Sequence, residues 1–231
     1  MKSQKETKAK SAVHGNWYND ACGTAFGMEL IGERWSLLVV RELMFGPLRF
    51  SALRANLPGI SAKVLTERLE TLEAANVLAK RILPPPASAQ VYELTRWGYA
   101  AEPLIQELGR WAAQSAQHNP TLPLSAVSLM LSMRTMVDRS ALPGVQGRVG
   151  FVIGSETFVA APTPTDLPIL RDDVASAGAV FSAPVAAALA AGIYAGVPWA
   201  ELERDAGVSI KGDRRLAMRY AAIFSLPPPL V

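Results

Sequence analysis

The sequence predicts an α+β protein of two domains, in which a winged helix-turn-helix precedes a mixed domain of helices and strands. Apolar residues recur with helical spacing up to about residue 75 and then alternate as in short strands. Residues 119–123 contain two prolines and interrupt both patterns. Beyond them the composition shifts to a methionine-bearing helix and further strands. We therefore expect an arm at residues 1–16, a winged-helix domain at 17–118 and a second domain at 119–231.

The composition is typical of a soluble globular protein with a buried core. Half of the 231 residues are hydrophobic, 19% are charged and 7% are aromatic, which excludes intrinsic disorder. Cys22 is the single cysteine, and His14 and His118 are the only histidines, so we expect no metal site and no cofactor. No apolar segment follows the polar residues 1–10, as a signal peptide would require, and we expect a cytoplasmic protein.

Charge and hydropathy limit the partners. Residues 1–118 hold 14 Lys and Arg against 11 Asp and Glu, whereas residues 119–231 hold nine of each. We expect residues 1–16 to form a flexible basic arm that is a solvated tail rather than a nucleic-acid contact. Residues 174–200 are uncharged, but they are rich in Ala and Gly and contain two prolines. They predict a buried strand and a packed helix rather than a membrane span.

The first domain is expected to begin with three helices. Phe26, Leu30 and Ile31 form the apolar face of a short helix. Residues 35–45 are apolar on nearly every side, which predicts a helix central to the core. A Gly-Pro pair ends this helix, and residues 50–56 are long enough for two further helical turns. The pattern is helix, tight turn, helix.

A helix with an exposed polar face is predicted next. Ser61 is placed to cap it, and Leu65, Leu69 and Leu72 line one stripe at i, i+4 and i+7. Two short strands joined by a proline-rich tip are expected after it, at residues 77–83 and 90–94. These elements specify a winged helix-turn-helix, whose second helix is slim enough for the major groove of B-form DNA.

One long helix, capped by Thr95, is expected to extend to about residue 118. Leu104, Leu108 and Trp111 form a stripe on it that is too apolar for the surface of so small a domain. A monomer would have to expose this stripe. We therefore predict a homodimer that is joined through this helix and the first one.

The second domain is predicted to mix helices and strands. A helix is expected at residues 124–137. Two more helices are expected to begin at Pro184 and Pro198, and a closing helix is expected after Asp213. The strands are expected at residues 147–153, 156–161, 177–182 and 208–211. The sequence contains no Gly-rich phosphate loop, no Gly-x-Ser-x-Gly elbow and no HExxH motif, so we expect no catalytic residues and no enzyme activity.

Three motifs of the first domain occur in a characteristic order. They are LIGERWSLLVVREL at residues 30–43, FGPLRF at 45–50 and LPGISAKVLTERL at 57–69. Together they resemble the HxlR family of bacterial transcription regulators, relatives of the MarR group, over roughly residues 17–116. The resemblance implies a dimeric repressor that binds a palindromic operator in double-stranded DNA, with its recognition helix at residues 61–75.

The resemblance also implies which side chains contact DNA. Residues of the recognition helix would face the bases, cations of the preceding helix would lie near phosphates, and two more would lie at the base of the wing. The implied contacts are Arg49, Arg54, Ser61, Lys63, Thr66, Glu67, Arg68, Lys80 and Arg81. Glu67 departs from the family, in which many members have an uncharged amide at this position. The departure matters because a carboxylate repels phosphate. Arg41 and Glu42 lie in a nearly apolar helix, and we expect them to form structural ion pairs.

Cys22 lies just before the first helix, where members of this family often carry a cysteine. In some of them this thiol senses oxidants or electrophiles, which makes Cys22 a candidate redox site. The surrounding residues favour an ordinary thiol, since no Lys or Arg is adjacent and Gly23 stands where the family commonly has proline. We expect DNA binding not to respond to oxidants.

The second domain ends in two motifs, VSIKGDRRL at residues 208–216 and FSLPP at 224–228. With the order of helices and strands, they resemble the sterol-carrier-protein fold, whose members hold lipids or other apolar molecules between the sheet and its helices. The resemblance implies a pocket for a small hydrophobic ligand. Its candidate lining is Met130, Met133, Phe151, Ile153, Phe158, Phe181, Tyr194 and Trp199. Ordinary core packing remains the alternative for the methionines, and an apolar-ligand carrier the alternative function.

Overall fold

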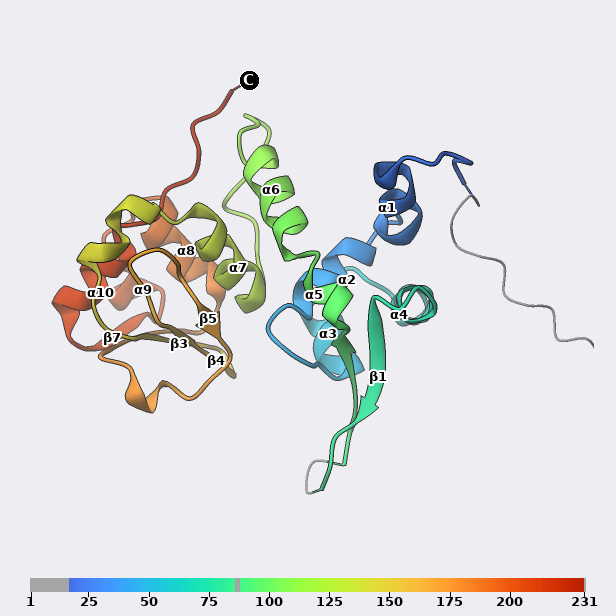
Figure 1. The fold of residues 1–231 in the computed structure, drawn as a ribbon. Helices are drawn as coiled ribbons and strands as arrows, with labels where there is room; N and C mark the ends of the chain where they lie inside the picture. The colour runs from blue at the N-terminus through green and yellow to red at the C-terminus, as the bar shows by residue number, and fades with distance from the viewer. Residues whose placement is uncertain (1–16, 86–87, 231) are drawn as a thin grey trace, which may run out of the picture. The chain divides into compact units, whose positions relative to one another are not determined.

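The computed structural model describes residues 17–85 and 88–230 of the chain (Figure 1). Packing divides them into two compact units. The first unit contains residues 17–40 and Leu48–Gly98, and the second contains Arg41–Pro47 and the residues from Tyr99 on. The predicted arm and the wing-tip residues Pro86 and Ala87 lie outside the described residues.

The first unit is a winged helix-turn-helix followed by a single helical turn. Its elements are α1 (Gly23–Ile31), α2 (Ser36–Glu42, of which the last two residues belong to the second unit), α3 (Phe50–Asn56), α4 (Ala62–Ala74), β1 (Leu78–Ile82), β2 (Gln90–Leu94) and α5 (Arg96–Tyr99). The two strands pair antiparallel, with Leu78 opposite Leu94 and Ile82 opposite Gln90. Leu48 extends this sheet by an isolated antiparallel bridge to Tyr92.

Helix α4 forms as the sequence predicts. The Ser61 hydroxyl accepts a hydrogen bond from the Val64 N–H at 3.2 Å, which satisfies one of the free donors of the first turn. Leu65, Leu69 and Leu72 are all buried, with at most 1% of their surface exposed. The predicted cap and the predicted leucine stripe are both confirmed.

Two other helices of the N-terminal region differ from the prediction in length. Helix α2 ends at Glu42, three residues earlier than expected, where N–H groups bond to carbonyls three residues back. The predicted long helix over residues 95–118 is wrong, because it is divided into α5 and α6 (Glu102–Ala112). Pro103 lies in the first turn of α6, and a proline removes one helical hydrogen bond and clashes with the preceding turn. A helix can therefore begin there but not continue through it.

The second unit has a sheet of five strands in the order β5-β4-β3-β6-β7. Strands β3 and β6 run parallel, and the other neighbouring pairs are antiparallel. After α6 its elements are α7 (Ala126–Met136), η1 (Arg139–Gly144), β3 (Val149–Ile153), β4 (Glu156–Ala160), β5 (Ile169–Leu170), η2 (Val174–Ser176), β6 (Ala179–Ala183), α8 (Ala186–Tyr194), α9 (Trp199–Asp205), β7 (Ser209–Gly212) and α10 (Arg214–Ala221). Strand β5 was not predicted, because two residues carry no periodicity.

Aromatic rings fill the core of the second unit. Phe151 stacks on Phe181 with centroids 5.7 Å apart, and Trp199 contacts Phe181 at 5.0 Å. Tyr220 of α10 lies 5.8 Å from Phe151 and is fully buried. Close packing of these large side chains stabilises the unit. Within the described ranges, no helix has the length and apolar character needed to cross a membrane.

Residues 41–47 lie within the N-terminal sequence motifs but pack in the second unit. The ring of Phe45 meets Phe158 edge to face at 5.5 Å, and the guanidinium of Arg134 lies 4.4 Å over the Phe45 ring. Glu42 is fully buried and accepts hydrogen bonds from Arg41 at 2.7 Å and from the Ser125 hydroxyl at 2.8 Å. The predicted ion pair of Arg41 and Glu42 is confirmed.

Candidate nucleic-acid interface

The exposed face of α4 lies opposite its leucine stripe. The Lys63 side chain is 86% exposed and its Nζ lies 4.0 Å from the nearer carboxylate oxygen of Glu67. Ser61 and Thr66 are exposed as well. An exposed pair of this kind contributes little to stability, so Lys63 can exchange its partner for a phosphate without disturbing the fold.

Arg68 is placed differently from the other predicted contacts. Its side chain is only 17% exposed and forms an ion pair with Glu33, in the segment before α2, with Glu67 at 4.0 Å as a second partner. The structure does not bring Arg68 onto the exposed face with Lys63. Its guanidinium joins α4 to the segment that precedes α2.

Two further arginines lie at the ends of α3. Arg49 is the residue before the first turn, and Arg54 lies in the last turn, where a cation is favoured by the helix dipole. Both side chains are exposed. The structure thus places these two predicted phosphate contacts on the helix that precedes α4.

The cations at the base of the wing are paired within the first unit. Lys80 lies 3.2 Å from a Glu73 carboxylate oxygen, and this hydrogen-bonded carboxylate raises the pKa of Lys80. The Nε of Arg81 lies 2.9 Å from Glu93. Ile82, at the end of β1, is 80% exposed, although alternation along the strand places it on the same face as the buried Leu78. The wing therefore presents an apolar side chain beside cations that already have carboxylate partners.

Cys22 is the residue that precedes α1, and its thiol is exposed. The backbone N–H groups of Ala25 and then Thr24 lower the pKa of the thiol, because they donate toward the thiolate. Free donors at a helix N-terminus have this effect in general.

We expect alkylation of Cys22 by iodoacetamide to have a midpoint pH below that of the same chain in urea. The thiolate is the nucleophile, and in the folded chain it forms at a lower pH than in the unfolded chain. The reason is that the backbone donors that lower the pKa of Cys22 are lost on unfolding. The single cysteine makes the rate measurement unambiguous. Coincident midpoints would contradict this assignment.

Helix α6 exposes the predicted stripe. Leu104, Leu108 and Trp111 are 52%, 43% and 71% exposed, whereas Ile105 on the other side is buried. Met28 of α1 is exposed too. Adjacent large apolar side chains on one helix face are a common mark of a surface for another protein.

The residues predicted to line a ligand pocket are mostly core residues. Met130, Met133, Phe151, Phe158 and Phe181 have at most 1% of their surface exposed. Ile153 is buried and Trp199 packs against Phe181, whereas Tyr194 lines a cavity beside α8. Periodicity alone cannot separate a packed core from a pocket lining, because both place apolar residues on the same face.

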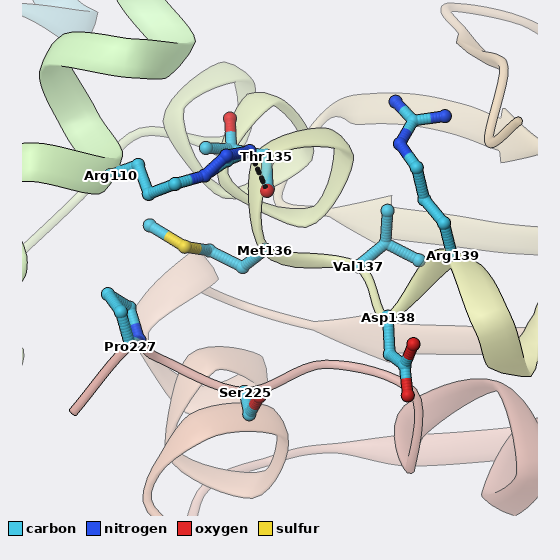
Figure 2. Close-up of a pocket in the computed structure, with 8 residues that line it drawn as sticks. All are labelled: Arg110, Thr135, Met136, Val137, Asp138, Arg139, Ser225 and Pro227. Atoms are coloured by element: carbon cyan, nitrogen blue, oxygen red, sulfur yellow. Dashed lines mark hydrogen bonds between the residues drawn. The ribbon is translucent and has the colours of Figure 1, made fainter.

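A second, more open cleft of about 440 Å³ lies at the end of α7 (Figure 2). Figure 2 shows the Arg110 guanidinium reaching the Thr135 carbonyl, at 2.7 Å. Arg139 pairs with Asp166 at 3.0 Å, and Asp138 accepts from the Ser140 hydroxyl at 2.6 Å. Each charged side chain that lines this cleft thus already has a hydrogen-bond or ion-pair partner.

Comparison with known proteins assigns the N-terminal part of the chain to a protein family. Residues 30–120 match the model of the HxlR-like helix-turn-helix family. The HTH-type transcriptional regulator YodB of Bacillus subtilis is 37% identical over 93 residues, which are 40% of this chain and 83% of YodB. YvaP of the same organism, an uncharacterised HTH-type transcriptional regulator, is 36% identical over 87 residues, 38% of this chain and 81% of YvaP.

Solved structures also match about two fifths of the chain. The reduced form of YodB is 34% identical, covers 42% of this chain and 97% of its own, and superposes with a TM-score of 0.39. A curated relative that is 37% identical, and of whose length the chain covers 83%, supports the family match. The chain belongs to the HxlR-like helix-turn-helix family.

Proposed function

We propose that the protein is a dimeric, sequence-specific DNA-binding repressor whose second unit senses a small hydrophobic ligand. The exposed polar face of α4 carries the DNA-binding part of this proposal, because it lies opposite a fully buried leucine stripe in a winged helix of this family. The dimer rests on the exposed stripe of α6. Two recognition helices about 34–36 Å apart would meet successive major grooves of a palindrome.

The proposed contacts divide into two groups. Lys63 and Thr66 read the groove or its edge, and Arg49 and Arg54 neutralise phosphates, since all four are exposed. Arg68 positions α4 through Glu33. The proposed ligand sensing rests on the motifs at residues 208–216 and 224–228, which resemble those of the sterol-carrier-protein fold.

Lys63→Ala combined with Arg54→Ala is expected to weaken operator binding and to reduce the slope of log affinity against log salt by about two. The wild-type protein first selects an operator from random duplexes, and fluorescence anisotropy then measures affinity at several salt concentrations. The melting temperature stays unchanged, because both side chains are exposed.

Arg204→Ala combined with Lys211→Ala is the matched control, since it removes the same charge from exposed positions of the second unit. It is expected to keep the wild-type affinity. Equal weakening by both pairs would mean that only net charge matters and would exclude the assigned contacts.

A further inference from the structure

A partly enclosed cavity of about 320 Å³ lies beside α8. Its helical wall consists of Ala187, Ala190, Ala191 and Tyr194, at the spacing of one helix face. Alanine side chains are too short to fill the space up to the segments that cross them. The cavity is therefore a consequence of the alanine-rich sequence of α8.

The remaining walls come from three segments outside the regular elements. Pro120 and Thr121 precede α7, Ala195 and Val197 follow α8, and Leu226 follows α10. The full lining is Pro120, Thr121, Ala187, Ala190, Ala191, Tyr194, Ala195, Val197 and Leu226. Every one of these side chains is uncharged, and only Thr121 and Tyr194 among them carry a hydroxyl.

Tyr194 supplies a neutral hydrogen-bonding group. Its hydroxyl lies 2.9 Å from the Ser132 hydroxyl, and a phenol with one such partner can make a further hydrogen bond. Burial raises the pKa of Tyr194, so the phenol is protonated at neutral pH. A charged ligand would lose its hydration here without gaining an ionic partner.

We propose that this cavity binds a small uncharged molecule that is mostly apolar and carries one hydroxyl or carbonyl group for Tyr194. The volume is at the lower end of the range for small-molecule sites, which favours a short alkyl or single-ring compound. The lining discriminates against carboxylates such as fatty-acid anions. The binding site itself stands on this geometry, whereas its effect on DNA rests on the proposed function.

The cavity walls are connected to the end of α6. The N–H of Leu230, in the same tail as Leu226, donates to the carbonyl of Gln114 at 2.8 Å, two residues after α6 ends. Pro120 and Thr121 follow α6 in the chain. A bound ligand would thus contact both segments that adjoin the helix bearing the exposed stripe, and it could bias the proposed dimer if it prefers one arrangement of them.

The test is calorimetric titration of the full chain with octan-1-ol and with octanoate, which share chain length and differ in charge. We expect saturable binding of octan-1-ol and binding of octanoate that is weaker by about tenfold or more. Ala191→Leu and the milder Ala195→Leu fill the cavity and should each weaken octan-1-ol binding by about tenfold. Ala200→Leu, at an exposed position of α9 outside the lining, should not.

Equal affinities for the two probes, or octan-1-ol binding that neither filling variant weakens, would overturn the proposal. So would the absence of octan-1-ol binding to the folded wild-type chain. Anisotropy with the selected operator, measured on the same samples, separates the two claims. If octan-1-ol binds without changing operator affinity, the site stands and the sensing function fails.

Discussion

Replacement of Phe45 by alanine is expected to lower the free energy of unfolding of the second unit by about 3–5 kcal/mol, the range for truncating a buried aromatic side chain. Phe45 is buried, and its ring contacts Phe158 at 5.5 Å and the Arg134 guanidinium at 4.4 Å. Its removal would leave a cavity beside Phe158 and take an aromatic partner from Arg134. Urea unfolding followed by circular dichroism measures the change.

The control is Leu170→Ala, which removes an apolar side chain of the second unit that is 63% exposed. It should change the free energy of unfolding by no more than about 0.5 kcal/mol. Similar values for the two variants would show that Phe45 does not take part in the core.

The same contacts determine where a fragment that contains the complete second unit can begin. A fragment that begins at Tyr99 lacks Arg41–Pro47 and so loses Phe45, Glu42 and their hydrogen bonds with Arg171 and Ser125. It also loses the edge-to-face contact of Phe45 with Phe158. Fragments of the second unit therefore need this segment, and the predicted boundary at residues 119–123 does not coincide with the limits of the compact units.

Local signals made much of the first unit predictable. The bounds of α3 and β2 are the ones that turn residues indicate, and α4 follows from Ser61 and the leucine spacing. Each of these signals lies within a few residues of the element that it specifies. The division of the long predicted helix is also encoded locally, by Pro103, although the apolar stripe by itself favours one continuous helix.

Interactions between distant residues were not predictable in this way. The position of Arg68 on a helix face does not reveal Glu33, thirty-five residues earlier, as its partner. In the same way, the sequence motif around Phe45 belongs to the winged helix, while its ring packs on Phe158. The alanines of α8 predict close packing from the sequence. The cavity beside them depends on where the segments that cross α8 lie in the folded chain.

Leu108→Glu combined with Trp111→Glu is expected to abolish the proposed dimer. Both side chains are exposed on α6, and a dimer would remove them from water. Two carboxylates at these positions would be buried without partners in such an interface. Sedimentation at micromolar concentration should then give the mass of one chain, whereas we expect twice that mass for the wild type.

Operator affinity should fall by about a hundredfold or more, because a monomer holds one half-site and loses the gain of linked binding. Leu170→Glu combined with Val185→Glu is the control, since it adds the same charges at exposed apolar positions outside α6. This control should remain dimeric and bind the operator normally. The loss would be assigned to the stripe of Leu104, Leu108 and Trp111 only if the α6 variant keeps its melting temperature. A monomeric α6 variant with wild-type operator affinity would exclude dimerisation as a requirement for DNA binding.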